Sequence, residues 1–274
     1  MVSLNRRADT RDSTFNVIGR GWKYYQERPW LGGLFWWTGF DYRGEPNPLS
    51  FPATGSEFGI LDYCGFPKDE AWYLKAWWTD EPVLHIFPHW NLQGHEGETV
   101  SVWVYSNCDE VELIVNGKRL GRKKMESGGY LSWDAVYKPG IVRATGYKNG
   151  RKVLTGEVRT TGSATRVKVS ADRPEINADG ADLAVCTLSL QDSKGRFVPD
   201  ARIPLRLTVN GPVRILGVGN GDPAWQAPER PLDPDARSFT VEAFNGLAQV
   251  LLQSTGTPGH ATLTVDADGV TPFT

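Results

Sequence analysis

Charged residues able to do acid–base chemistry gather in one stretch of the chain, directly after an apolar run. This stretch holds four carboxylates and one arginine: Asp41, Glu45, Glu57, Asp62 and Arg43. Carboxyl groups can act as proton donors, proton acceptors or nucleophiles, so a catalytic role has to be considered. The alternative, which we favour, is that they order the loop through hydrogen bonds to the backbone and to the arginine.

The elements around this stretch resemble a slice of an α/β fold. Residues 31–37 form a continuous apolar run, which is the pattern of a strand covered on both faces, as in a parallel sheet. A short helix is predicted over 19–28 and should end at Pro29. A second helix is predicted over 69–79, with Asp69 as its N-cap. One strand and two helices cannot close a (β/α)₈ barrel, so we expect this region to depend on other parts of a fold.

From residue 82 the pattern changes to short strands with alternating apolar and polar residues. The clearest cases are 99–106, 110–115, 183–191 and 247–254. The dipeptides Asn116-Gly117, Asn149-Gly150 and Asn245-Gly246 favour tight turns, since both residue types tolerate positive φ angles. The sequence therefore predicts a mainly β chain with two immunoglobulin-like β-sandwich domains, 82–161 and 162–274, preceded by a partial barrel segment over 1–81.

Several spaced motifs resemble the glycoside hydrolases of family 2, in particular bacterial β-galactosidases with extra β domains. The first runs from Gly32-Gly33 through Trp37-Thr38-Gly39 to Glu45-Pro46 and is similar to the eighth strand of that family's catalytic barrel and its loop. Similarity continues in 58–69, 84–91, 111–118, 178–183, 217–223 and 243–246. The resemblance covers nearly the whole chain from about Trp22 and identifies it as the C-terminal part of such an enzyme.

The resemblance implies a retaining enzyme that hydrolyses terminal β-galactosides with two carboxylates about 5–5.5 Å apart. Both would lie on earlier barrel strands, so we assign no catalytic residue here and expect this chain to be inactive alone. The resemblance implies that Trp37, next to Thr38, forms the floor of the sugar site, where an indole face can stack on a pyranose; core packing is the open alternative. This chain has one residue more than the family's usual spacing after Gly32-Gly33, so Trp36 is the competing choice for that tryptophan. Asp41, Arg43 and Glu45 are weaker candidates for lining that site. The parent protein would be bacterial, periplasmic or secreted.

The expected partners are a β-galactoside or other glycan and the missing N-terminal domains of the same enzyme. A different class of function is also open: tandem immunoglobulin-like domains could form a non-catalytic carbohydrate-binding or adhesion module. The tryptophan-rich first region favours the enzyme, because adhesion arrays do not need a buried parallel-type strand.

Composition argues against several other classes of function. A net charge of −2 gives no electrostatic basis for binding nucleic acid, and no apolar run is long enough to span a bilayer. His85 and His89 lie four residues apart on a predicted strand, about 13 Å along it, so they are poorly spaced for a metal. No glycine-rich nucleotide motif is present, and the three cysteines are widely separated. We therefore expect no metal and no cofactor.

Overall fold

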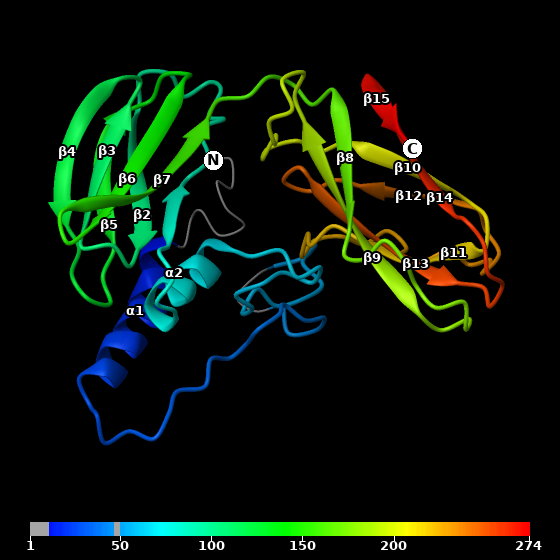
Figure 1. Ribbon diagram of the computed structural model, residues 1–274, viewed down its shortest axis with the longest axis horizontal. Coiled ribbons are helices and arrows are strands. Elements are labelled where there is room, and N and C mark those ends of the chain that lie inside the picture. Colours follow the sequence, from blue (N-terminus) through cyan, green and yellow to red (C-terminus); the bar gives the residue numbers. More distant parts are fainter. Residues whose placement is uncertain (1–10, 47–49) are drawn as a thin grey trace. The chain divides into compact units, whose positions relative to one another are not determined.

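Each of two compact units is assembled from two separate stretches of sequence. The first unit comprises Met1–Gly39 and Pro67–Thr160, and the second comprises Phe40–Phe66 and Thr161–Thr274. The predicted segment 1–81 thus contributes to both units. The structure, a computed structural model, describes residues 11–46 and 50–274 (Figure 1). The first ten residues of that segment, and 47–49 of its loop, lie outside the described residues.

The first unit contains a sandwich of a three-stranded and a four-stranded antiparallel sheet (Figure 1). Alternating residues from both sheets fill a common core, in which Trp90, Val102 and Leu113 are buried. The Asn116-Gly117 turn has the two positive φ angles, 48° and 80°, that its sequence predicts. The sheets have the strand orders β1(Leu84–Phe87)-β2(Thr99–Ser106)-β5(Leu131–Val136) and β4(Lys118–Lys124)-β3(Glu110–Val115)-β6(Ile141–Lys148)-β7(Arg151–Arg159).

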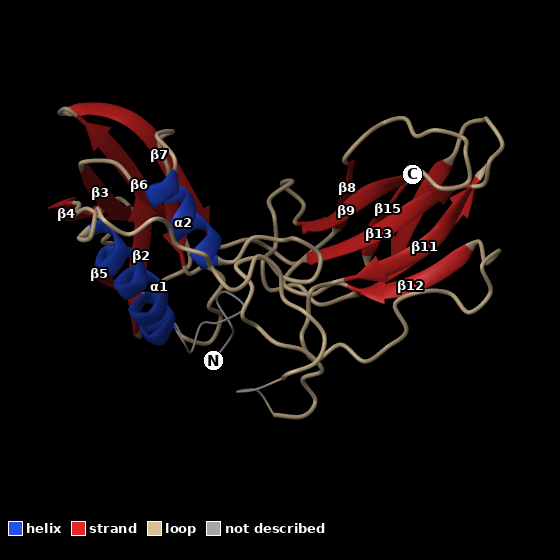
Figure 2. Cartoon of the chain, turned by 90° about the horizontal axis from the view of Figure 1, so that it is seen from below, coloured by secondary structure: helices blue, strands red, loops and turns tan. Residues whose placement is uncertain are grey.

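Both helices belong to this unit and lie side by side in Figure 2. Helix α1 (Arg11–Gln26) begins eight residues before the predicted start and ends before Pro29. Helix α2 (Asp69–Trp78) packs on the first sandwich, where the Tyr73 hydroxyl donates to the carbonyl oxygen of Gly128 at 2.7 Å. The predicted N-cap is wrong, because Lys68 occupies that position and makes no side-chain cap.

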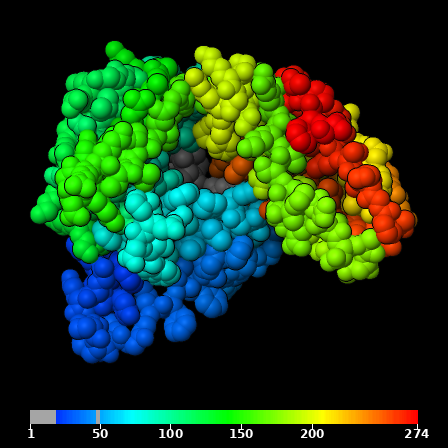
Figure 3. All heavy atoms as spheres, in the orientation of Figure 1, coloured from blue at the N-terminus to red at the C-terminus, as the bar shows by residue number. Residues whose placement is uncertain are grey.

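The predicted buried strand over 31–37 is wrong for this chain. The segment has no regular secondary structure, and Phe35 and Trp37 are 99% and 75% exposed. Its atoms form part of the blue surface in Figure 3. A barrel strand is stabilised by neighbours on both edges, and no ladder partner for it occurs among the residues that the structure describes. The apolar side chains of this segment are therefore left largely uncovered by the residues that the structure describes.

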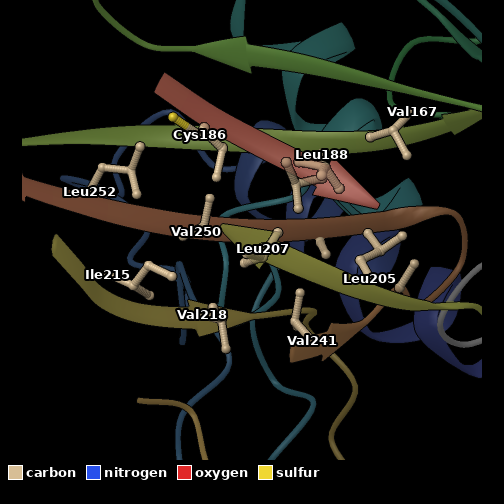
Figure 4. Close-up of a cluster of buried hydrophobic side chains, with 14 of the residues drawn as sticks. Val167, Cys186, Leu188, Leu205, Leu207, Ile215, Val218, Val241, Val250 and Leu252 are labelled. Atoms are coloured by element: carbon tan, nitrogen blue, oxygen red, sulfur yellow. The ribbon is translucent and has the colours of Figure 1, made fainter. Parts of the chain in front are cut away.

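The second unit contains a second β-sandwich built from eight strands. Four strands form each face, and a single parallel pair between β8 and β15 joins the two faces. Leu188, Leu205, Leu207 and Val250 point into the core between them (Figure 4). The strand order is β11(Val213–Gly219)-β13(Leu247–Ser254)-β9(Leu183–Gln191)-β8(Arg166–Ala171)-β15(Val270–Phe273)-β14(Thr262–Ala267)-β10(Pro204–Asn210)-β12(Ser238–Glu242). The mainly β prediction with two sandwiches is confirmed.

Candidate functional site

The stretch Phe40–Phe66, here called the 40–66 loop, is held on the second sandwich by hydrogen bonds distant in sequence. The backbone N–H of Thr54 donates to the carbonyl oxygen of Pro223 at 2.9 Å. The side-chain amide of Gln249, on β13, donates to the carbonyl oxygen of Cys64 at 3.0 Å. A sandwich strand and a sandwich loop therefore position the stretch that carries the predicted site carboxylates.

Asp41 organises the beginning of this loop. Its side chain is only 5% exposed, and its Oδ1 accepts a hydrogen bond from the backbone N–H of Gly59 at 2.9 Å. Its own backbone N–H donates to the carbonyl oxygen of Leu61 at 2.9 Å. The two chain segments approach so closely that a Cβ on Gly59 would lie 2.2 Å from the Asp41 nitrogen. Only glycine fits at that contact.

Asp62 closes the other end of the loop in the same manner. The side chain is fully buried, and Oδ1 accepts backbone N–H bonds from Cys64 at 2.8 Å and from Phe66 at 3.0 Å. Gly65, with a φ of 80°, supplies the left-handed turn between these donors. Asp41 and Asp62 thus order the loop through backbone groups, which is the role favoured above from sequence.

Arg43 connects the loop to a second-sandwich segment about 180 residues later. Its guanidinium donates to Thr54 Oγ1 at 2.7 Å and to the carbonyl oxygen of Trp225 at 3.4 Å, and it forms an ion pair with Glu229. It also lies over the ring of Tyr63, 4.6 Å from the centroid. Burial raises the pKa of Tyr63 to about 12. Sequence reasoning missed Glu229 and Tyr63, since no local pattern links residues so far apart.

Glu45 and Trp37 complete the four predicted site residues. Glu45 has a φ of 46° and accepts a hydrogen bond from the Tyr42 hydroxyl at 3.0 Å. Asp41, Arg43 and Glu45 therefore all lie in the 40–66 loop of the second unit. Trp37 belongs to the first unit, and three quarters of its surface is open to solvent. Its indole face is presented to solvent and not packed in a core.

His85 contacts an acidic and an aromatic side chain of helix α2. No group of three or more His, Cys, Asp or Glu side chains that could hold a metal ion occurs within it. His85, one of the two histidines weighed from sequence, bonds through Nε2 to Asp69 Oδ1 at 2.6 Å and stacks on Trp72 at 5.0 Å between ring centroids. Within the same part of the chain, no helix is long and apolar enough to cross a membrane.

Comparison with known proteins places these features in one family. Residues 167–274 match the model "Glycoside hydrolase family 2 C-terminal domain 5", and residues 97–154 match a domain of unknown function (DUF4982). Beta-galactosidase BoGH2A of Bacteroides ovatus is 39% identical over 250 residues, covering 90% of this chain and 28% of that protein. A beta-glucuronidase of Formosa agariphila is 34% identical over 158 residues, covering 56% of this chain and 16% of that protein.

Solved structures agree with these relationships. A beta-glycosidase from Bacteroides vulgatus aligns with a TM-score of 0.85 and 34% identity over 93% of this chain and 32% of its own. A glycosyl hydrolase family 2 member from Bacteroides cellulosilyticus aligns with a TM-score of 0.84 and 30% identity, covering 93% of this chain and 37% of its own. The chain spans between 16% and 37% of the length of these relatives. It belongs to glycoside hydrolase family 2 and carries C-terminal domains of that family.

Proposed function

We propose that this chain is the C-terminal portion of a retaining glycosidase that hydrolyses terminal β-galactosides. The observation that carries the proposal is the anchorage of the 40–66 loop on the second sandwich. In sequence this loop resembles one at the carboxyl end of a barrel strand, where barrel enzymes place their active sites. The accessory sandwich would then hold an active-site loop in the shape that the sugar needs, which reduces the ordering cost at the moment of binding.

Charge supports a neutral galactoside over an acidic sugar. The 40–66 loop contains four carboxylates and a single arginine, and that arginine is already paired with Glu229. A glucuronide carries its own carboxylate, which would meet like charge here and find no spare cation in the loop. Relatives of both specificities occur, a beta-galactosidase and a beta-glucuronidase, so this electrostatic difference supports the finer choice.

The chemistry of retaining hydrolysis indicates which roles would belong to this chain and which to the rest of the parent enzyme. That reaction uses an acid–base carboxyl and a nucleophilic carboxylate about 5–5.5 Å apart. Asp41 and Asp62 are buried and bonded to backbone N–H groups, so they hold the loop and are poorly placed to exchange protons with a substrate. Both reacting carboxylates would come from other parts of the parent enzyme. This chain would supply the loop and Trp37, whose exposed indole can stack on the apolar face of a pyranose.

The proposal is tested on the longer enzyme that contains this chain, with p-nitrophenyl β-galactoside and p-nitrophenyl β-glucuronide as substrates. We expect turnover of the galactoside and none of either compound by the 274-residue chain alone. Trp37→Ala should lower kcat/KM roughly 10- to 100-fold, since losing the stacked ring removes about 1.5–3 kcal/mol of contact.

The matched control is Trp30→Ala, which removes a similarly exposed tryptophan, 73% accessible, from the same segment. Its kcat/KM should stay within about twofold of the unmodified enzyme. A preference for the glucuronide, turnover by the isolated chain, or equal losses in the two tryptophan variants would each contradict the proposal.

A further inference from the structure

The outer face of the second sandwich carries polar side chains. Along each strand they alternate with the apolar side chains that form the core. Leu205, Leu207 and Val241 point inward from β10 and β12 (Figure 4). Because successive side chains of a strand face opposite sides, Arg206 and Thr240 lie on the outer face, and both are exposed. The alternation therefore fixes which residues this face presents.

Strand register places these residues in a row across three strands. Arg206 of β10 is the direct partner of Thr240 on β12 and of Asp266 on β14. With strands about 4.8 Å apart, the row spans roughly 10 Å. Thr208 and Ser238 form the adjacent register pair and carry hydroxyl groups. Hydroxyl, guanidinium and carboxylate groups are thus presented together on one face.

The same residues line two adjoining hollows. Arg206 and Thr240 contribute to both of them. The larger, of about 500 Å³, is also lined by the aromatic residue Trp225. Phe239 borders this hollow too, but its side chain packs against the core, on the same side of β12 as Val241. The smaller, of about 170 Å³, is polar and is also lined by Asp266. The result is a groove with an aromatic wall at one end, an arginine in the middle and a carboxylate at the other end.

The polar groups of the groove are not used within the fold. Arg206 and Asp266 are direct cross-strand neighbours, yet neither has an ion-pair or side-chain hydrogen-bond partner among the described residues. Other arginines of this unit form ion pairs: Arg43 pairs with Glu229, and Arg202 pairs with Asp222. The donors and acceptors of the groove are therefore left for water or for a ligand.

The aromatic wall is held in place before any ligand arrives. The carbonyl oxygen of Trp225 accepts a hydrogen bond from Arg43 at 3.4 Å, and the side-chain amide of Gln226 donates to the carbonyl oxygen of Pro52 at 3.0 Å. Glu229, a few residues later, pairs with the same arginine. A wall that is already ordered loses little conformational entropy on binding.

We propose that this groove binds a neutral oligosaccharide chain. Trp225 stacks on the apolar face of a pyranose ring, and Arg206 and Asp266 hydrogen-bond to its vicinal hydroxyls in a two-pronged manner. Asp268 also lines the polar hollow, so carboxylates outnumber the guanidinium and disfavour an acidic glycan.

Isothermal titration calorimetry on the complete 274-residue chain tests the proposal without requiring catalysis. The probes are the neutral β-1,4-linked tetrasaccharides of glucose, xylose, galactose and mannose, with tetragalacturonic acid as the charged counterpart. We expect at least one neutral tetrasaccharide to bind. Trp225→Ala and Arg206→Ala should each weaken that binding at least tenfold, while Arg206→Lys weakens it less.

Arg166→Ala, which removes an exposed arginine on β8, is the matched control and should leave the affinity unchanged. Thermal melts of each variant report whether it has folded, and Arg206→Lys keeps the test decisive if Arg206→Ala is unstable. The proposal is overturned if no neutral tetrasaccharide binds, if tetragalacturonic acid binds equally well, or if the groove substitutions leave the affinity as it was. Activity of the longer enzyme plays no part in these outcomes.

Discussion

The contact of Gly59 with the start of the 40–66 loop allows a sharp test of how that loop is held. An alanine Cβ at this position would lie 2.2 Å from the backbone nitrogen of Asp41, 2.3 Å from the carbonyl carbon of Phe40 and 2.4 Å from the carbonyl oxygen of Leu61. All three are backbone atoms, so no flexible side chain can move aside. Gly59→Ala must therefore separate the two segments of the loop.

The size of the effect follows from the bonds that this separation breaks. It removes the Asp41 N–H bond to the Leu61 carbonyl and the Gly59 N–H bond to the Asp41 carboxylate, both 2.9 Å long. A neutral bond contributes about 0.5–1.5 kcal/mol and one to a charged group about 1.5–3 kcal/mol, so the loop should lose about 2–4 kcal/mol of local stability. Opening by that amount accelerates amide exchange by roughly 30- to 1000-fold.

Hydrogen exchange read by mass spectrometry on peptides covering 40–66 measures this loss directly. Peptides from β9 and β13 should keep their protection, because their core lies between the sheets of the second sandwich. Gly33→Ala is the matched control, since a Cβ at Gly33 meets no atom within 4 Å. If Gly59→Ala leaves exchange in the loop unchanged, or if Gly33→Ala produces the same acceleration, the described anchorage of this loop is wrong.

Three further predictions concern the second sandwich and its loop. Leu205→Ala, at a fully buried position, should lower the free energy of unfolding by about 2–5 kcal/mol in denaturant titrations, whereas Leu232→Ala, at a site 98% exposed, should leave it unchanged. Backbone hydrogen bonds, the largest from Asp182, lower the pKa of Asp179. The ionised form of Asp179 therefore stabilises the fold at pH values above the pKa of ~3.9 that an aspartate has in the unfolded chain. This stabilisation is lost as the pH falls through the lower pKa of the folded state. Thermal melts of the unmodified chain and Asp179→Asn should converge as the pH falls through the folded pKa of Asp179, and a constant gap would refute this. Burial raises the pKa of Tyr63 to about 12, so the ultraviolet phenolate signal that Tyr63→Phe removes should develop above pH 11, and its appearance near pH 10 would contradict that environment.

Most of the strands were predictable because their pattern is local. The predicted bounds of 99–106, 183–191 and 247–254 are confirmed, since alternating residues report directly which side of each strand is buried. Lys118–Lys124 was missed because its residues are almost all polar and its burial does not alternate. It is a strand because the Asn116-Gly117 turn folds it back onto β3. Pairing, and not its own composition, makes it a strand.

The sequence alone determined the class of this protein: alternation, turn dipeptides and spaced motifs indicated two β-sandwiches from family 2. Tertiary structure decided what the apolar and charged residues near the start do. The run 31–37 has a strand's composition but no partner strand among the described residues, so it stays exposed. Arg43 resembles a sugar-site residue in sequence, yet it pairs with Glu229, 186 residues away. A strand ladder or an ion pair requires two segments of the chain, and a local sequence pattern describes only one of them.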